Sequence, residues 1–108
     1  NTHNNYGISS AMNSDNLRIA KYAGSINGYM RNGCKVDEVS IFDSDQSSNI
    51  SSIYNSGVPF DLVTLGTNPL HWWRMGDGDT FPTLEDSIGS ADFTMTNMTS
   101  SNIVSDVP

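Results

Sequence analysis

The sequence is poor in cysteine, in basic residues and in charge of any kind. Of its 108 residues one is a cysteine, five are lysine or arginine, and charged residues make up 16%. The single thiol, Cys34, cannot form an intrachain disulfide or build a thiolate metal site. We expect Cys34 to be a small buried hydrophobic residue, because free cysteine is among the most buried residue types.

The shortage of basic residues argues against nucleic acid as a partner. The formal net charge is −7, and the basic residues are scattered from Arg18 to Arg74. Binding to a phosphate backbone needs clustered lysine and arginine, which displace counterions. No apolar stretch reaches the length of a membrane span, so membrane insertion is not expected. The chain begins at Asn1 rather than at methionine, and we expect it to be part of a longer protein.

Uncharged polar residues are abundant. Serine (16), asparagine (12) and threonine (8) together make up one third of the 108 residues. They alternate with β-branched and aromatic residues in short segments, a pattern typical of a β-rich, turn-rich fold. Disordered chains usually combine low hydrophobicity with high charge, and only the first is present here. The composition therefore predicts a globular, mainly-β chain.

Alternation of apolar and polar residues locates the expected strands. They are Leu17–Tyr22, Tyr29–Met30, Cys34–Phe42, Leu70–Met75 and Ala91–Met98. Residues 60–69 read as a linker, and residues 86–90 as a turn. The chain thus predicts several short strands rather than a repeated unit.

One short helix is expected at about residues 47–55. Ile50, Ile53 and Tyr54 fall at i, i+3 and i+4 and make an apolar stripe. Residues 43–46 supply N-cap candidates, and Gly57 lies where a left-handed cap would end the helix.

Two groups of residues carry a resemblance to a known family. The run Val36-Asp37-Glu38-Val39-Ser40-Ile41-Phe42, followed by a helix ending in Ile53-Tyr54-Asn55-Ser56-Gly57, resembles the last strands of concanavalin A-like lectin/glucanase (laminin G-like, jelly-roll) domains. Trp72–Gly78 and then Asp86–Asn97 are similar to the opening strands of the same domains. The domain ending therefore precedes the domain beginning. The composition also resembles the C-termini of structural or fibre proteins of marine bacteriophages.

The resemblance implies an antiparallel β-sandwich or jelly-roll segment. Its expected parts are a polar leader or strand remnant (1–16), terminal strands and helix (17–57), a linker (58–69) and a C-terminal strand arm (70–108). The arm would complete this sandwich or a neighbouring one, since an unpaired sheet edge recruits a strand. The implied function is a non-catalytic structural or adhesive module on a virion surface or in another extracellular assembly. Its partners would be copies of itself or other subunits.

Trp72, Trp73 and Arg74 are the candidate contact residues for a subunit or a glycan. Adjacent strand residues point to opposite faces, so at most one tryptophan enters a given core. The other packs against a second layer or lies exposed to a sugar or a subunit, and core or subunit packing is the favoured role. Arg74 lies on the same face as Trp72 and could stack on it. The alternative function is therefore a carbohydrate-binding, lectin-like domain that uses an exposed tryptophan and contacts cell-surface glycans.

Asp77 and Asp79 are candidate Ca²⁺ ligands, although a plain turn is the favoured interpretation of Gly76–Asp79. No other cofactor is expected. Catalysis is not expected either, because no serine lies in a Gly-x-Ser-x-Gly elbow and Asp37 and Glu38 would point to opposite strand faces. A glycoside hydrolase fragment is a third, weaker alternative. Asn49-Ile50-Ser51 and Asn97-Met98-Thr99 match the N-glycosylation pattern. The pattern has no significance in a bacterial or phage protein, and a chain rich in serine and asparagine produces it by chance.

Overall fold

A computed structural model describes residues 17–19 and 33–104 of the chain. The chain divides into two compact units, Asn1–Cys34 and Lys35–Pro108. All helices and strands given below belong to the second unit. The expected leader and the expected strand Tyr29–Met30 lie outside the described residues, as does most of the expected strand Leu17–Tyr22.

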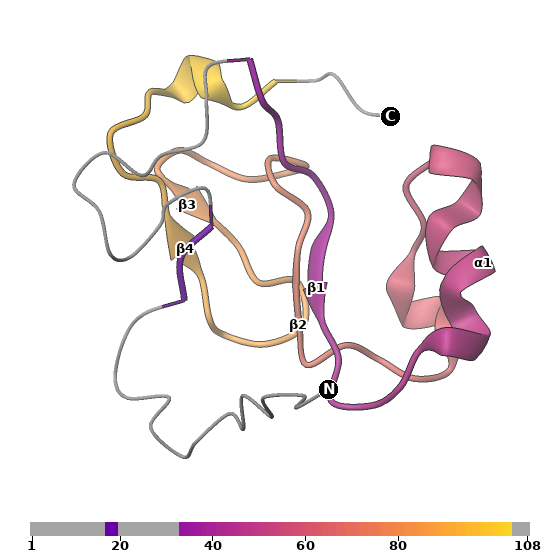
Figure 1. Cartoon of the computed structure of the whole chain (residues 1–108). Helices are drawn as coiled ribbons and strands as arrows, with labels where there is room; N and C mark the ends of the chain where they lie inside the picture. The colour runs from indigo at the N-terminus through magenta and orange to yellow at the C-terminus, as the bar shows by residue number, and fades with distance from the viewer. Residues whose placement is uncertain (1–16, 20–32, 105–108) are drawn as a thin grey trace, which may run out of the picture. The chain divides into compact units, whose positions relative to one another are not determined.

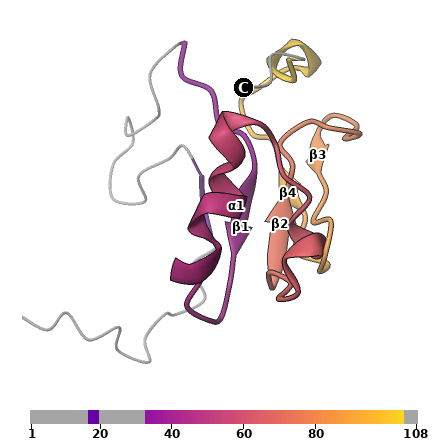
Figure 2. The same cartoon turned by 90° about the vertical axis from the view of Figure 1, so that its right-hand side faces the viewer.

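The second unit contains two antiparallel strand pairs and one short α-helix (Figure 1). The strands are β1 (Val39–Ile41), β2 (His71–Trp73), β3 (Thr83–Leu84) and β4 (Phe93–Thr94). β1 pairs with β2, and β3 pairs with β4. In Figures 1 and 2 the helix α1 (Ile50–Tyr54) stands on one side of the β1–β2 pair and the β3–β4 pair lies on the other. Antiparallel strands with one short helix agree with the expected class at this coarse level.

The C-terminal arm pairs with the preceding part of the same chain. Val39 lies opposite Trp73, and Ile41 lies opposite His71. On its other side β2 meets the segment around Asp86, through a bridge between Trp73 and Asp86. The Ser87 N–H also donates to the carbonyl oxygen of Trp72 at 2.7 Å. β2 is therefore the central strand of this layer.

The strands are shorter than the alternation predicted. The expected strand Cys34–Phe42 is reduced to Val39–Ile41, because Glu38 adopts a left-handed backbone (φ 52°) that an extended strand cannot include. β2 has three residues instead of six and is followed by another left-handed residue, Met75 (φ 55°). Cys34, expected to be buried, is exposed. It follows the left-handed Gly33 (φ 87°) and lies outside the strand that would have covered it.

The predicted short helix is confirmed. Residues 47–57 form α1 with a turn of 3-10 helix at each end. Gln46 is its N-cap residue, and the carboxylate of the preceding Asp45 accepts from the Ser47 N–H at 2.8 Å. Asn55 (φ 39°) ends it in a left-handed conformation. The apolar stripe stays largely exposed, however: Ile50 is 58% and Tyr54 68% accessible.

The segment expected to be a linker contributes a side chain to the core. Leu62–Leu65 form a 3-10 helix whose first turn is capped by the Asp61 carboxylate, which accepts from the Val63 N–H. Leu62 is only 4% exposed, so this segment is held by burial and not merely spanned. None of the described helices is long and apolar enough to cross a membrane.

Candidate functional site

Both tryptophans of β2 are buried, and each is buried by a different set of neighbours. Trp72 is 5% and Trp73 1% exposed. Neither indole is thus exposed as the lectin-like alternative requires. Adjacent strand residues do point to opposite faces, as expected, but both faces of β2 are covered.

The face of Trp72 carries an acid–indole–guanidinium cluster. The Trp72 Nε1–H donates to Glu38 Oε2 at 2.7 Å, and the Arg74 guanidinium lies 5.2 Å from the indole centroid. The predicted stacking of Arg74 on Trp72 is confirmed. Arg74 also contacts Glu38 at 3.4 Å and pairs with Asp77 Oδ2 at 2.7 Å. The guanidinium thus links the start of β1 to the end of β2 and to the loop that follows β2.

The face of Trp73 is an aromatic cluster. The His71 imidazole stacks on the Trp73 indole with ring centroids 5.5 Å apart. Phe93 packs against the same indole at 4.5 Å. The Trp73 Nε1–H donates to the carbonyl oxygen of Ala91 at 2.8 Å, so this buried polar group is satisfied. Trp73 thus connects strand β2 to β4 and to the segment that precedes β4.

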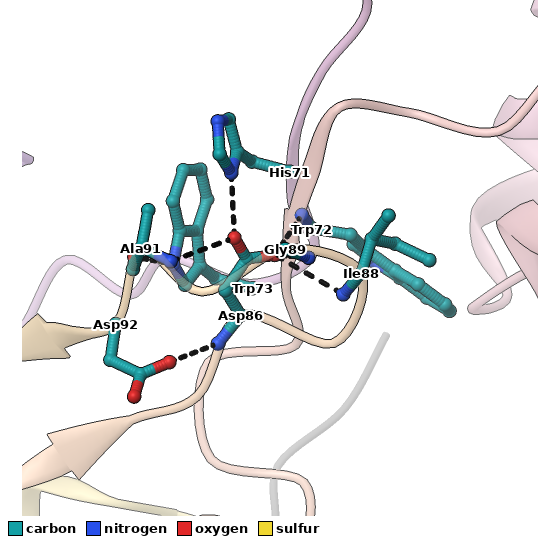
Figure 3. Close-up of polar contacts among 8 residues, drawn as sticks. All are labelled: His71, Trp72, Trp73, Asp86, Ile88, Gly89, Ala91 and Asp92. Carbon is teal, nitrogen blue, oxygen red and sulfur yellow. Dashed lines mark hydrogen bonds and ion pairs between the residues drawn. The ribbon is translucent and has the colours of Figure 1, made fainter.

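Asp86 is the hub of this face (Figure 3). Its side chain is fully buried. Oδ1 accepts from the backbone N–H groups of Trp72, Ile88 and Gly89 at 3.0, 3.2 and 3.0 Å. Oδ2 accepts from the Ala91 N–H at 3.2 Å and contacts His71 Nδ1 at 2.6 Å. One carboxylate therefore closes its own turn and joins that turn to β2.

These contacts favour the ionised form of Asp86. Burial acts to raise the pKa of the carboxyl, because it penalises the charge. The hydrogen bonds that the carboxylate accepts outweigh burial, first among them the bond from the Gly89 N–H and the contact with His71. Together they hold the pKa well below its ordinary value of 3.8. A buried carboxylate with several N–H donors is expected to behave in this way.

Gly89 is required by close packing against this pair. A Cβ atom at position 89 would lie 2.5 Å from Asp86 Oδ2 and 2.8 Å from His71 Nδ1. Both distances are shorter than real Cβ contacts allow. The Asp86-Ser87-Ile88-Gly89 order was predicted as a turn. Its Asp at the first position is a known signal for side-chain to backbone bonding, but nothing local indicates the bond to β2.

The contact between His71 and Asp86 has the geometry of an oriented acid–base pair, which the sequence did not predict. A carboxylate at Nδ1 orients the imidazole and leaves Nε2 on the far side of the ring, the arrangement found in hydrolase triads. Across residues 17–19 and 33–104 no hydroxyl or thiol bonds to Nε2. The observed role of the pair is to bridge β2 and the Asp86 turn.

The candidate calcium ligands are occupied by protein donors. Asp79 Oδ2 accepts from the Gly76 N–H and Oδ1 from the Glu85 N–H, each at 2.8 Å, while Asp77 pairs with Arg74. The two carboxylates thus organise the turn that was the favoured interpretation. In the described part of the chain, no group of three or more His, Cys, Asp or Glu side chains is arranged to hold a metal ion.

The lowered pKa of Asp86 predicts a dependence of stability on pH. Below 3.8 the unfolded chain binds more protons than the folded one, so the free energy of unfolding falls on acidification. The slope contributed by this one group approaches about 1.4 kcal/mol per pH unit. Urea titrations at several pH values between neutral and strongly acid measure it.

Asp86→Asn supplies the comparison for this prediction. The substituted amide does not titrate, so the difference in free energy of unfolding between wild type and Asp86→Asn should narrow as the pH falls. Asp77→Asn, at an exposed ion pair, should change the free energy of unfolding at neutral pH by at most about 1 kcal/mol. Parallel curves for Asp86→Asn and wild type would contradict the assignment.

Comparisons with known proteins return no match for this chain. No family model matches it, and no curated protein and no solved structure matches it. The likeness to laminin G-like domains therefore rests on the residues that carry it.

Proposed function

We propose that the chain is a non-catalytic structural or adhesive module of an extracellular or virion-surface assembly, and that it engages neighbouring subunits through the outer edge of β1. The sandwich architecture and the laminin G-like resemblance belong to this proposal. In support, the side chains whose chemistry would best suit catalysis form hydrogen bonds that hold segments of the chain together. His71, Asp86 and Glu38 all bond to groups on other segments of the chain.

The edge of β1 is the observation that carries the proposal. The N–H of Trp72 donates to Asp86, and its carbonyl accepts from Ser87. Both groups therefore point away from β1. In an antiparallel pair, residues whose backbone groups point away from each other form the non-hydrogen-bonded pair. Ser40 lies opposite Trp72, so the Ser40 N–H and C=O face the outer edge.

That edge is unpaired as far as the described residues go, since β1 belongs to a two-stranded sheet. Unpaired edges are templates for strand addition, in which backbone hydrogen bonds supply the affinity. The partner that fits such an edge is an extended strand from another subunit. The lectin-like alternative has less support, because both tryptophans are buried.

Ser40→Pro tests the edge directly. Proline removes the outward N–H and leaves the β1–β2 ladder intact, a position at which strands tolerate it. We expect the wild-type chain to self-associate in a concentration-dependent way, and the variant to do so at least about tenfold more weakly, the loss of one hydrogen bond of roughly 1.4 kcal/mol. Sedimentation velocity over a wide concentration range measures both.

Two further variants make this result specific. Ser40→Ala keeps the N–H and should associate like wild type. Val39→Pro removes an N–H directed at β2 and should unfold the sheet, which far-UV circular dichroism would detect. A wild-type chain that remains monomeric at every concentration, or a folded Ser40→Pro chain that associates like wild type, would overturn the proposal.

A further inference from the structure

The fold presents its two Asn-x-Ser/Thr triplets in different ways. Both Asn49-Ile50-Ser51 and Asn97-Met98-Thr99 satisfy the sequence pattern for N-linked glycosylation. The pattern alone does not separate them, and serine and asparagine are frequent in this chain. The local structure around each asparagine does separate them.

Asn97 lies in an exposed turn between β4 and the 3-10 helix Ser100–Asn102. Its backbone is left-handed (φ 58°), a conformation that asparagine adopts readily. Its side chain forms no hydrogen bond with the rest of the described chain. The next residue, Met98, is 46% accessible. The Asn97 amide is therefore open to an enzyme without any change in the core.

The hydroxyl of the third residue is also within reach. Thr99 is exposed; its Oγ1 contacts the side chains of Ser101 and Asn102 at 2.7 and 3.3 Å, and its side chain also accepts from the Asn102 backbone N–H in a capping box. These contacts belong to the cap of a three-residue helix at the surface. Such exposed side-chain bonds contribute little to stability, so a local opening frees the hydroxyl.

Asn49 is held in place by contrast. It is half-buried, and its Nδ2 donates to Gln46 Oε1 at 2.8 Å. It is the last residue of one 3-10 helix and leads directly into α1. Its triplet is helical throughout, so reaching Asn49 and Ser51 together in an extended or turn conformation requires unwinding α1.

We propose that Asn97 is an N-glycosylation site of the folded chain and that Asn49 is not. The co-reactant is a lipid-linked oligosaccharide diphosphate. The Asn97 amide nitrogen forms a C–N bond to the anomeric carbon of the first sugar, and the bond from that carbon to the lipid diphosphate breaks. The amide loses one proton, and the lipid diphosphate leaves with the electron pair. Occurrence of the reaction in a cell rests on the proposed extracellular placement, whereas the competence of Asn97 does not.

A purified single-subunit oligosaccharyltransferase with a lipid-linked oligosaccharide tests this on the full chain. The folded chain should gain one glycan, and peptide mapping should place it at Asn97. Short peptides that span each triplet serve as unfolded acceptors and are the control for the effect of the fold. Both peptides should be modified, which shows that the fold makes the selection.

Variants at the two triplets complete the experiment. Asn97→Gln and Thr99→Ala should abolish modification of the folded chain, whereas Thr99→Ser and Asn49→Gln should leave it within about twofold of wild type, because serine and threonine both serve at the third position. A glycan on Asn49 of the folded chain would overturn the proposal. So would an unmodified Asn97 in the folded chain, whether or not its peptide is modified. Failure of self-association through β1 would leave this result unaffected.

Discussion

Asp86→Ala is expected to destabilise the second unit by about 3–5 kcal/mol, because it removes a buried carboxylate that accepts hydrogen bonds from four backbone N–H groups. The N–H groups of Trp72, Ile88, Gly89 and Ala91 would all lose their partner. Alanine lacks the carboxylate, so it leaves the volume of that group empty and supplies no oxygen to accept these hydrogen bonds. The chain has few large buried side chains among its described residues, so a loss of this size removes most of the stability expected of a small domain.

Thermal and urea unfolding followed by tryptophan fluorescence measures the effect. Each kcal/mol corresponds to roughly 4–8 °C in Tm for a unit of this size. Asp92→Ala is a graded control, because the Asp92 carboxylate accepts only from the Asp86 N–H, at 2.9 Å. It should lose about 1 kcal/mol. An Asp86→Ala chain that unfolds within a few degrees of wild type would show that the hub is dispensable.

The features that the sequence predicted well are local. The helix at 47–57 depends on Asp45 at its start, on Asn55 at its end and on the apolar spacing between them. The turn after Asp86 and the stacking of Arg74 on Trp72 also follow from residues a few positions apart. These elements could be predicted because short-range geometry determines them.

The features that could not be predicted from the sequence depend on contacts between distant segments. Asp86 bonds to the Trp72 N–H and to His71, 14 and 15 positions away, and no periodicity marks such a pair. Glu38 accepts from the Trp72 indole across 34 positions. The left-handed backbone at Glu38 is unusual for this residue type, so the alternation extended the strand too far.

The burial of both tryptophans follows from the same long-range contacts. Strand alternation predicted that at most one indole would enter a given core, and left the other to pack against a second layer or to lie exposed to a glycan or a subunit. In the structure, side chains cover the second face instead: Glu38 accepts a hydrogen bond from the Trp72 indole N–H, and Arg74 lies over the indole ring. A small unit can therefore bury both residues without a second sheet.

Trp73→Ala is expected to cost about 3–5 kcal/mol, the range for removing a buried aromatic residue. Trp73 is 1% exposed and contacts elements on both of its sides. Its ring stacks on His71 and packs on Phe93, and its Nε1–H satisfies the Ala91 carbonyl. Alanine would leave a cavity between β2 and β4 and an unpaired carbonyl oxygen beside it.

Trp73→Phe divides this loss into its two parts. Phenylalanine keeps most of the ring and removes the hydrogen bond to Ala91, so about 1–2 kcal/mol should be lost. Leu70→Ala, at a side chain that is 48% exposed, should change stability little. Far-UV circular dichroism follows all three, since the substitution removes a fluorophore. Equal stabilities for Trp73→Ala and Leu70→Ala would mean that the aromatic cluster does not hold β2 to β4. A loss in Trp73→Phe as large as in Trp73→Ala would place the stabilisation in the indole hydrogen bond rather than in the packing.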